Sequence, residues 1–447
     1  MKNAVPVPWQ VEKVISTLEQ NGYMAYLVGG ALRDLMLGRV ASDYDVATSA
    51  RPEETERVFA GEKIIETGLK HGTVTVLIDW LPIEITTFRV DGPYADGRHP
   101  DSVAFTPDVR EDLARRDFTM NAIAYSPREG FVDPFGGEKD IEDGMIRCVG
   151  DPLRRFEEDG LRVMRAVRFA SELGFEVEPK TAAAVHSESG MLERVSAERI
   201  AVELNKTLVG DGAGRVLEEF SDVFCRFIPE LEPCIGFDQM NPHHCFDVFT
   251  HAVHAACAAP KKKDLRLAAL LHDVGKPRCF TVDESGTGHF YGHAAVSEQI
   301  ARGVLRRLKY DNETVRTVTT LIKYHSYQPE PNERSVRRAL NKLGAETFFD
   351  LLDLKRADNR AQAPEYLYRQ GDFDELERIA REIIAKDECF SLKDLAVGGR
   401  DLIEAGCPEG PEVGRGLEAL LGLVIDGALP NEKEALIGYY EVNLLKN

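Results

Sequence analysis

Residues 27–38 read LVGGALRDLMLG, and shortly after them residues 42–48 read SDYDVAT. The apolar start of the first stretch predicts a strand that runs into two glycines, followed by a helix that opens near Ala31. Gly29 and Gly30 leave room for a phosphate to approach the backbone, and the free N–H groups at a helix start attract anions. The stretch therefore predicts a strand, a turn and a helix that together present an anion-binding backbone.

Two carboxylates follow this turn. Asp43 and Asp45 lie in a run that continues with Val46 and Ala47, so on a strand both side chains point to the same face. Paired carboxylates hold two divalent cations side by side, the arrangement used in phosphoryl and nucleotidyl transfer. Glu84, on the alternating run IEITTF, is a candidate third carboxylate, although a single acid on a strand is usually part of its solvated face. An isolated DxD is usually a surface turn, but its place after a GG-x-x-RD turn favours the catalytic interpretation.

The rest of the chain separates into two kinds of pattern. Residues 25–145 alternate short β-like runs, such as 73–78 and 83–88, with turns and helical patches. From Pro152 onward apolar residues recur with a helical period, interrupted by a Gly-rich stretch at 283–290 that resembles a hairpin. The 447 residues are enough for about three domains. These observations predict an α+β protein whose strands are concentrated in its first third.

The overall charge is acidic. Lys and Arg number 55 against 75 Asp and Glu, and a net charge of −20 argues against a nucleic-acid partner because phosphate contacts need clustered basic residues. Local charge differs, since residues 154–168 carry five arginines against three acids. No apolar run reaches the roughly 18 residues of a membrane span, no signal peptide is visible, and the eight cysteines form no CxxC pair. We expect a reduced, cytoplasmic protein without a membrane partner.

A stripe of charged residues follows Pro152. Asp159, Arg162, Arg165 and Arg168 recur every three residues on a predicted helix whose opposite side is apolar. An Asp acceptor beside an Arg donor can recognise the Watson–Crick edge of cytosine or adenine, because both present an amino group next to a ring nitrogen. A solvated helix face with i,i+3 ion pairs would give the same stripe. Its position after the paired carboxylates favours nucleotide binding.

These motifs occur together in the order of a known family. The chain resembles the class II nucleotidyltransferases of the polymerase-β-like superfamily, which include the bacterial CCA-adding tRNA nucleotidyltransferases and the poly(A) polymerases. The segments that carry the resemblance are GGALRD at 29–34, DYD at 43–45, a flexible-loop sequence at 89–105, DLARRDFTMNAIAY at 112–125, GDPLRRFEEDGLRVMRAVRFASELGF at 150–175 and SAERIAVELNKTL at 196–208.

The resemblance implies Mg²⁺ as cofactor and tRNA, CTP and ATP as partners. It implies that Asp43 and Asp45 are the catalytic residues and bind Mg²⁺. It also implies nucleotide contacts by Gly30, Arg33, Arg116, Asp117, Asn121, Asp159, Arg162, Arg165 and Arg168.

A second group of residues, rich in histidine, lies between 243 and 358. His272 and Asp273 directly follow the apolar run LRLAALL, and imidazole with carboxylate suits a first-row divalent metal. The H...HD...D pattern resembles the HD phosphohydrolase superfamily, which implies a metal site formed by His251, His272, Asp273 and Asp358 and occupied by a second divalent transition metal. His293 and His325 fall where two-metal members have further ligands. A structural relic and an RNA-binding surface are the alternatives.

The sequence therefore predicts four parts. These are a nucleotidyltransferase head at 1–145 with a mixed sheet, an all-α neck at 146–228 with nucleotide-reading and RNA-binding motifs, an HD-type helical domain at 229–365, and a helical body and tail at 366–447 that binds tRNA.

The expected activity is template-independent addition of CCA to the 3′ end of tRNA, with a second, phosphohydrolase activity at the HD residues. Poly(A) polymerase, an A-adding or CC-adding enzyme, and an HD phosphohydrolase with a nucleotide-sensing N-terminal half are the alternatives. The intact loop sequence at 89–105 argues against CC-only addition, and the absence of a basic tail argues against poly(A) synthesis. The sequence does not indicate the oligomeric state.

Overall fold

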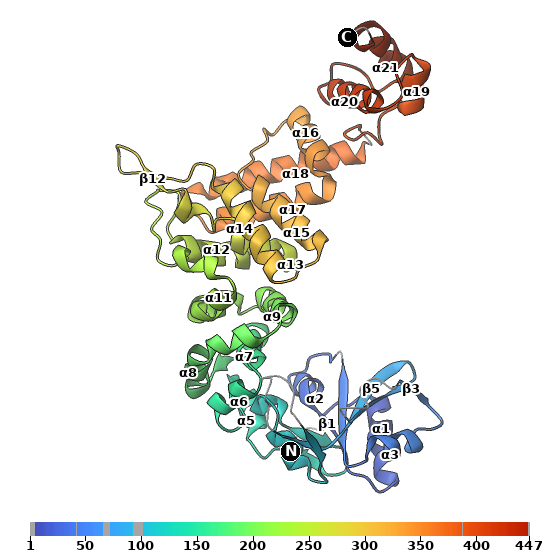
Figure 1. Cartoon of the computed structure of the whole chain (residues 1–447), viewed down its shortest axis with the longest axis vertical. Coiled ribbons are helices and arrows are strands. Elements are labelled where there is room, and N and C mark those ends of the chain that lie inside the picture. The colour runs from blue at the N-terminus through green and yellow to red at the C-terminus, as the bar shows by residue number, and fades with distance from the viewer. Residues whose placement is uncertain (1–4, 42, 66–71, 93–101, 387, 446–447) are drawn as a thin grey trace. The chain divides into compact units, whose positions relative to one another are not determined.

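The computed structural model describes residues 5–41, 43–65, 72–92, 102–386 and 388–445. The chain divides into two compact units, Met1–Pro229 and Glu230–Asn447 (Figure 1). The expected flexible loop at 89–105 lies partly outside the described residues, because 93–101 are not among them.

Within the described residues the first unit is built on a seven-stranded sheet in the order β3-β4-β5-β2-β1-β8-β9. Its strands are β1 (Ala25–Val28), β2 (Tyr44–Thr48), β3 (Lys63–Ile65), β4 (Thr73–Ile78), β5 (Leu81–Thr87), β8 (Ala124–Ser126) and β9 (Gly130–Val132). β2 and β5 run parallel, whereas β1 is antiparallel to both of its neighbours. The predicted strands before the glycines and at 73–78 are confirmed, and the run at 83–88 forms most of β5.

Two details of the glycine-rich turn differ from the prediction. The helix after β1, α2 (Gly29–Met36), begins at the first glycine and not near Ala31. β2 begins at Tyr44, so Asp43 lies directly before the strand and only Asp45 is part of it. The two carboxylates are therefore placed by a loop end and a strand, not by one strand face.

Helices pack against the sheet and form most of the chain that follows it. α1 (Trp9–Gln20) and α3 (Pro52–Val58) lie beside each other against the sheet in Figure 1. β6 (Arg89–Asp91) pairs with β7 (Val103–Phe105), and β10 (Met145–Ile146) pairs with β11 (Glu176–Val177). The remaining helices of this unit are α4 (Val109–Ala114), α5 (Gly137–Glu142), α6 (Pro152–Glu158), α7 (Leu161–Leu173), α8 (Pro179–Ser187), α9 (Ala197–Val209), α10 (Ala213–Glu219) and α11 (Ser221–Phe227).

The prediction of a single helix after Pro152 is wrong, because the chain forms two helices there, α6 and α7. Between α6 and α7 the backbone of Asp159 is extended, with φ −144° and ψ 105°. Its Oδ1 accepts the N–H of Leu161 at 3.0 Å, which satisfies a free donor at the start of α7. A Cβ on the next residue, Gly160, would lie 2.7 Å from the backbone oxygen of Met191, so glycine allows the break to pack closely there. Asp159 thus lies in the break and the three arginines of the stripe lie on α7.

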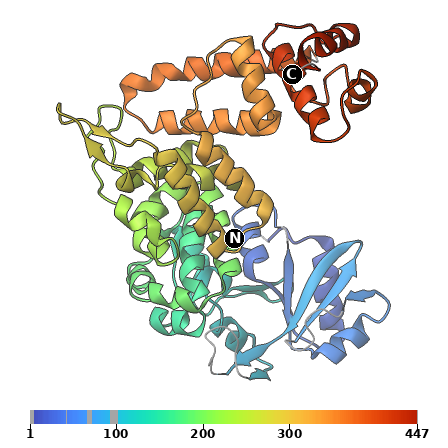
Figure 2. The same ribbon diagram turned by 45° about the horizontal axis from the view of Figure 1, so that its top comes forward.

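The second unit is mainly helical. α12 (Val248–Ala258) packs against α13 (Lys263–Leu271) and α17 (Ala345–Arg360). α14 (His293–Arg307) and α15 (Asn312–Tyr324) run side by side, as the golden helices of Figure 2 show. β12 (Thr281–Val282) and β13 (Gly288–His289) form the hairpin predicted at 283–290.

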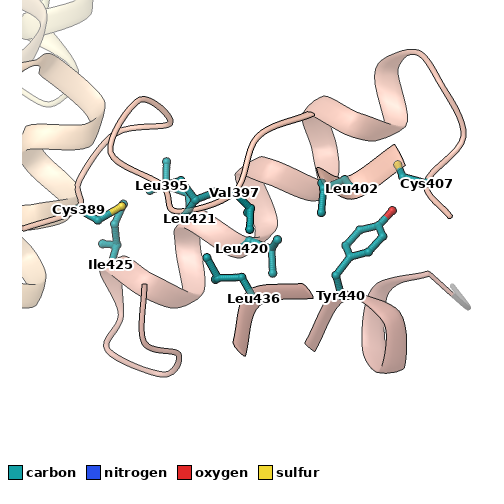
Figure 3. Packing of buried hydrophobic residues seen from close by; sticks show 10 residues of the cluster. All are labelled: Cys389, Leu395, Val397, Leu402, Cys407, Leu420, Leu421, Ile425, Leu436 and Tyr440. Carbon is teal, nitrogen blue, oxygen red and sulfur yellow. The ribbon is translucent and has the colours of Figure 1, made fainter. Parts of the chain in front are cut away.

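The C-terminal helices of this unit have their own hydrophobic core. α19 (Gly399–Glu404), α20 (Pro411–Ile425) and α21 (Lys433–Tyr439) enclose buried side chains that include Leu402, Leu420, Leu436 and Tyr440 (Figure 3). α16 (Glu333–Leu343) packs against α17 and α18 (Gln370–Ala385), and it contacts α20. The predicted α+β class, with a helical C-terminal region, is confirmed. Among the described residues no helix is long and apolar enough to cross a membrane.

Candidate active site and histidine cluster

Three carboxylates meet at the centre of the sheet. Asp45 is in register with Val28 of β1 on one side and with Glu84 of β5 on the other. Burial raises the pKa of Asp45 to about 6; Arg116 opposes this shift, and Glu84 and Asp43 add to it. A largely buried carboxylate that is repelled by two others fits a site for divalent cations, because a cation would relieve this repulsion.

Gly29 brings the start of α2 against this carboxylate. Its φ is +73°, and a Cβ there would lie 3.3 Å from Oδ2 of Asp45 and 3.1 Å from Nη1 of Arg116. A side chain at this position would be strained by the backbone and crowded by both groups. Both glycines were expected to leave room for a phosphate; Gly29 makes the close approach, whereas a Cβ on Gly30 would lie 3.7 Å from Nη2 of Arg33.

A chain of hydrogen bonds links the predicted nucleotide contacts. Arg33 donates from Nη1 to Oδ1 of Asn121 at 2.9 Å, and Nδ2 of Asn121 donates to Oδ1 of Asp117 at 3.1 Å. Arg165 donates from Nε to Oδ2 of Asp117 at 2.8 Å. Burial alone would raise the pKa of Asp117, but Arg165 and Arg162 outweigh it and hold that pKa well below its usual range. Asp117 is therefore a fixed, ionised acceptor.

Asp159 and Arg162 are both held by other parts of the first unit. Arg199 of α9 donates from Nη2 to Oδ2 of Asp159 at 3.0 Å. Nη1 of Arg162 donates to Glu158 at 2.6 Å, and Nη2 donates to the backbone oxygen of Arg115 at 3.1 Å. The predicted acceptor and donor are thus fixed before any nucleotide arrives.

A cavity of about 390 Å³ brings most of these groups together. Its lining consists of Val28, Asp45, Val46, Thr73, Thr86, Arg89, Arg115, Arg116, Asp117, Asp159, Leu161, Arg162, Arg165 and Arg199. Six arginines against three aspartates give the lining an excess of positive charge, which suits an anionic ligand.

The cavity divides the predicted residues into two sets. Asp45, Arg116, Asp117, Asp159, Arg162 and Arg165 line it, whereas Asp43, Gly30, Arg33, Asn121 and Arg168 are not among its lining residues. Sequence reasoning missed Thr73, Thr86, Arg89, Arg115 and Arg199. The alternation of β4 and β5 could have indicated Thr73 and Thr86. Thr86 lies two residues after Glu84 on β5 and so shares its face of the sheet, and Thr73 on β4 is opposite Thr86.

Arg168 lies outside the cavity and joins two helices. It is 7% exposed, its Nε donates to Glu203 of α9, and its Nη1 donates to Glu172 at 2.5 Å. Its guanidinium carbon lies 3.9 Å from the ring centroid of Phe169. Arg168 thus packs α7 against α9, and it shares the Phe169 ring with Arg33 and Arg165, whose guanidinium carbons lie 4.9 Å and 5.3 Å from the same centroid.

The histidine pattern of the second unit forms a buried cluster. Nε2 of His251 on α12 lies 3.0 Å from Oδ1 of Asp358 on α17. Nε2 of His272, at the end of α13, lies 3.1 Å from Oδ2 of Asp273 and 3.6 Å from Oδ1 of Asp358. The four residues named from the H...HD...D pattern therefore converge, although they come from three helices.

Two further histidines extend this cluster on the other side of Asp273. Nε2 of His293 lies 3.3 Å from Oδ1 of Asp273, and Nε2 of His325 lies 3.7 Å from the same oxygen. The two Nε2 atoms are 3.0 Å apart. Asp273 thus belongs to two groups of metal-ligand type, one with His251 and His272 and one with His293 and His325.

The outer nitrogens of all four rings have the same kind of partner. Each Nδ1 faces a backbone carbonyl oxygen: Ala361 at 3.1 Å for His251, Ala269 at 2.7 Å for His272, Phe290 at 2.7 Å for His293 and Ile322 at 2.6 Å for His325. A carbonyl only accepts, so each Nδ1 carries the proton and each Nε2 is directed into the cluster. This is how histidines that bind a metal are oriented by their surroundings.

The inner atoms of the cluster also fit a cation. Nε2 of His251, Nε2 of His272 and Oδ1 of Asp273 are buried and make no hydrogen bond of good geometry within the described residues. Lys276 lies 2.6 Å from Oδ2 of Asp273. Burial would lower the pKa of His272, but Asp273 and Asp358 outweigh it and raise the pKa to about 10. Buried nitrogen and oxygen atoms that converge without hydrogen-bonding one another are typical ligands of a metal site.

The cluster opens into a cavity of about 610 Å³ within the second unit. Asp273, Asp358, His293 and His325 are among its lining residues, together with the basic side chains Lys276, Lys355 and Arg369. Its basic groups would attract a phosphate.

Three family models match parts of the chain, and their descriptions agree with the nucleotidyltransferase motifs. The chain matches the family models "Poly A polymerase head domain" at residues 25–147 and "Probable RNA and SrmB-binding site of polymerase A" at 174–233. Residues 289–439 match "tRNA nucleotidyltransferase domain 2 putative".

Individual relatives match over nearly the whole chain. The CCA-adding enzyme of Geobacillus stearothermophilus is 36% identical over 95% of this chain and 95% of its own, and that of Levilactobacillus brevis is 35% identical with the same coverage. A solved structure of the Bacillus stearothermophilus CCA-adding enzyme in complex with CTP has a TM-score of 0.73 at 34% identity and covers 96% of both chains. The Thermotoga maritima CCA-adding enzyme complexed with tRNA, at 19% identity and a TM-score of 0.58, shares the fold.

Proposed function

The chain belongs to the family of CCA-adding enzymes, and from this membership we propose that it completes the 3′ end of tRNA by adding C, C and A from CTP and ATP without a template. The observation that carries the proposal is the position of Asp45 in a cavity whose charged lining consists of six arginines and three aspartates. The excess of arginine fits a triphosphate, and the acids supply the metal ligands and fixed acceptors that the reaction needs.

We propose Asp43 and Asp45 as the ligands of catalytic Mg²⁺. Their family uses divalent metal, and carboxylate oxygens are the ligands that Mg²⁺ prefers. The crowding of Asp45 by Asp43 and Glu84 supports a cation here. When bound, the cations lower the pKa of the attacking 3′-hydroxyl and stabilise the charge that develops at phosphorus.

The chain's own residues would bind and orient the nucleotide. Arg116 and Arg165 are cavity cations suited to phosphate oxygens, and the fixed carboxylate of Asp117 suits a ribose hydroxyl donor. Asp159 would accept from the exocyclic amino group of cytosine or adenine, and Arg162 would donate to the adjacent ring nitrogen. Uracil and guanine present a keto oxygen where the amino group would be, so the acceptor would repel them.

We also propose the four-part division at 1–145, 146–228, 229–365 and 366–447, with tRNA bound by the helical parts. The family matches at 25–147 and 174–233 and the separation of the two units after Pro229 support the boundaries near 145 and 228, whereas the match at 289–439 spans the boundary at 365. Family membership supports action in the cytoplasm, where tRNA is completed.

Nucleotide supply tests complete CCA addition against its partial forms. With a tRNA that lacks CCA, we expect CTP alone to add two residues and ATP alone to add none. With a tRNA that ends in CC, ATP alone should add one residue. Gel analysis of product length checks each mixture. Extension by ATP without CTP on the shorter tRNA, or failure of ATP on the CC-ended tRNA, would contradict complete CCA addition.

A second candidate function is a metal-dependent phosphohydrolase in the second unit. It is favoured by the orientation of four histidines by backbone carbonyls toward Asp273 and by three basic side chains, Lys276, Lys355 and Arg369, in the lining of the cavity beside them. His251, His272, Asp273 and Asp358 would hold a divalent transition metal, and Lys276 would meet the phosphate. The substrates that fit this chemistry are nucleotides or 2′,3′-cyclic phosphates.

A further inference from the structure

We propose that Lys355 and Arg369 form an anion site for the phosphate group of a substrate in the cavity of the second unit. The inference deepens the second candidate function, the metal-dependent phosphohydrolase, and rests on it. It starts from the burial of Lys355, a residue of α17 that lines the cavity although it is only 6% exposed. An ammonium group removed from water needs an opposite charge and hydrogen bonds to compensate for the lost solvation.

Lys355 has little of this compensation. Its Nζ donates one hydrogen bond, to the backbone oxygen of His325 at 2.7 Å, and within the described residues it forms no ion pair. Asp358, three residues further along α17, attracts it from a greater distance, but Oδ1 of Asp358 lies 3.0 Å from Nε2 of His251. Because an ammonium group has several N–H donors, Lys355 retains both charge and donors for a ligand.

Lys276, the other lysine in the lining, differs in this respect. It is 4% exposed, but its Nζ lies 2.6 Å from Oδ2 of Asp273, donates to Oε1 of Gln239 at 2.7 Å and lies 3.3 Å from Nε2 of His244. Its charge and its donors are thus matched within the protein, and a phosphate would have to share them. Lys355 is the lysine of this cavity whose charge an anionic ligand would neutralise.

Arg369 adds a second cation to the same cavity. It lines the cavity, repels Lys355 and forms no ion pair within the part of the chain that the structure describes. Glu330 and Asp372 are also in the lining, but neither is paired with these two cations. A phosphate would relieve the repulsion, because its oxygens can accept from an ammonium and a guanidinium at the same time.

The proposed anion site lies beside the histidine cluster. His325, whose backbone oxygen accepts from Lys355, also has its ring directed toward Asp273, with Nε2 3.7 Å from Oδ1. A phosphate bound by Lys355 would therefore be next to the residues proposed to hold the metal. Hydrolysis of a phosphate ester needs this proximity, because the phosphate has to be oriented at the metal site.

The test measures the binding of inorganic phosphate to the full chain by calorimetry, with Mn²⁺ in slight excess over protein. Lys355→Met keeps a long unbranched side chain and removes the charge, so we expect it to raise the Kd for phosphate in this cavity at least about tenfold. Arg369→Gln should raise it by a smaller factor. Phosphate bound by the arginines of the first unit contributes equally in all variants. Lys262→Met is the control, because Lys262 pairs with Asp350 outside the cavity, and it should bind phosphate as the wild type does.

The melting temperature separates anion binding from a structural role. A buried cation without an ion pair destabilises the fold, so without phosphate Lys355→Met should melt at or above the temperature of the wild type. Phosphate should then raise the melting temperature of the wild type more than that of the variant. If Lys355 only holds the end of α15 through the backbone oxygen of His325, the variant should melt at a lower temperature and bind phosphate normally, which would overturn the inference. Should Lys355→Met fail to fold, unchanged phosphate binding by Arg369→Gln would overturn it.

The anion site and the phosphohydrolase can fail separately. If phosphate binding depends on Lys355 but the wild type hydrolyses no phosphate ester, the anion site is supported and the phosphohydrolase is refuted. If the wild type hydrolyses a 2′,3′-cyclic phosphate and Lys355→Met does so with the same kcat/KM, the phosphohydrolase is supported and the anion site is refuted.

Discussion

Asp45→Asn is expected to abolish nucleotide addition, by at least about 10³-fold, while leaving the fold intact. The substitution keeps the shape of the side chain but removes the negative charge that would hold a cation next to the reacting atoms. The raised pKa of Asp45, about 6, means that the folded protein holds this proton more tightly than the unfolded chain does. That contribution to stability is lost as the pH rises through 6, so at pH 8 the ionised side chain weakens the fold. The melting temperature of Asp45→Asn at pH 8 should therefore equal or exceed that of the wild type.

The control for this variant is Asp79→Asn. Asp79 is an exposed turn residue with φ 47°, a conformation that asparagine adopts readily, and it is not among the cavity residues. We expect full activity from it. Initial rates of CMP and AMP incorporation and melting curves measure both variants. Substantial transfer by a folded Asp45→Asn protein would remove this carboxylate from the catalytic site.

The second large effect concerns the histidine cluster. A divalent metal that binds the folded cluster at a concentration about 1,000 times its Kd stabilises the folded state by about 4 kcal/mol. For a unit of this size that corresponds to a rise in melting temperature on the order of 10 °C. We expect Mn²⁺, Co²⁺ or Ni²⁺ to produce such a rise in the wild type and not in His272→Ala. A metal must displace a proton from His272, whose pKa is about 10, so the rise should grow with pH.

His289→Ala is the matched control, because His289 pairs with Asp283 on the hairpin and is not part of the cluster. It should keep the metal response. Nucleotide transfer should persist in His272→Ala, since the cluster lies in the second unit. If the wild type hydrolyses a 2′,3′-cyclic phosphate and His272→Ala does not, the cluster has phosphohydrolase activity. No thermal shift and no bound metal across Mg²⁺, Mn²⁺, Co²⁺ and Ni²⁺ would contradict the proposed metal site.

Sequence periodicity predicted the strands well and the site geometry in part. The alternating run at 73–78 coincides with β4 because its side chains alternate between two environments, a strictly local signal. The break at Asp159 was missed because its cause is not local: Gly160 is required by the approach of Met191, about thirty residues further along the chain. Arg199 was missed as a cavity residue for the same reason, since its contact with Asp159 joins residues 40 positions apart in the sequence.

The arginines of residues 154–168 illustrate why charge counting has limits. Arg162, Arg165 and Arg168 are each paired with carboxylates of the same unit, so much of their charge is balanced within the protein. Arg154 differs from these arginines because its side chain is 82% exposed, and its Nε lies 4.0 Å from Oδ2 of Asp151. The excess of arginine that matters is the one in the cavity, where residues distant in sequence are brought together by the fold.

The central claim, template-independent completion of tRNA, is tested most directly by the sequence of the product. A tRNA lacking its terminal CCA is incubated with CTP, ATP and Mg²⁺, and the extended 3′ ends are sequenced, with an unrelated RNA of similar length as control. The account predicts that the tRNA gains C, C and A and then stops, and that the unrelated RNA is not extended. A long run of A on either RNA, or a tRNA product that ends after CC or gains only A, would contradict it.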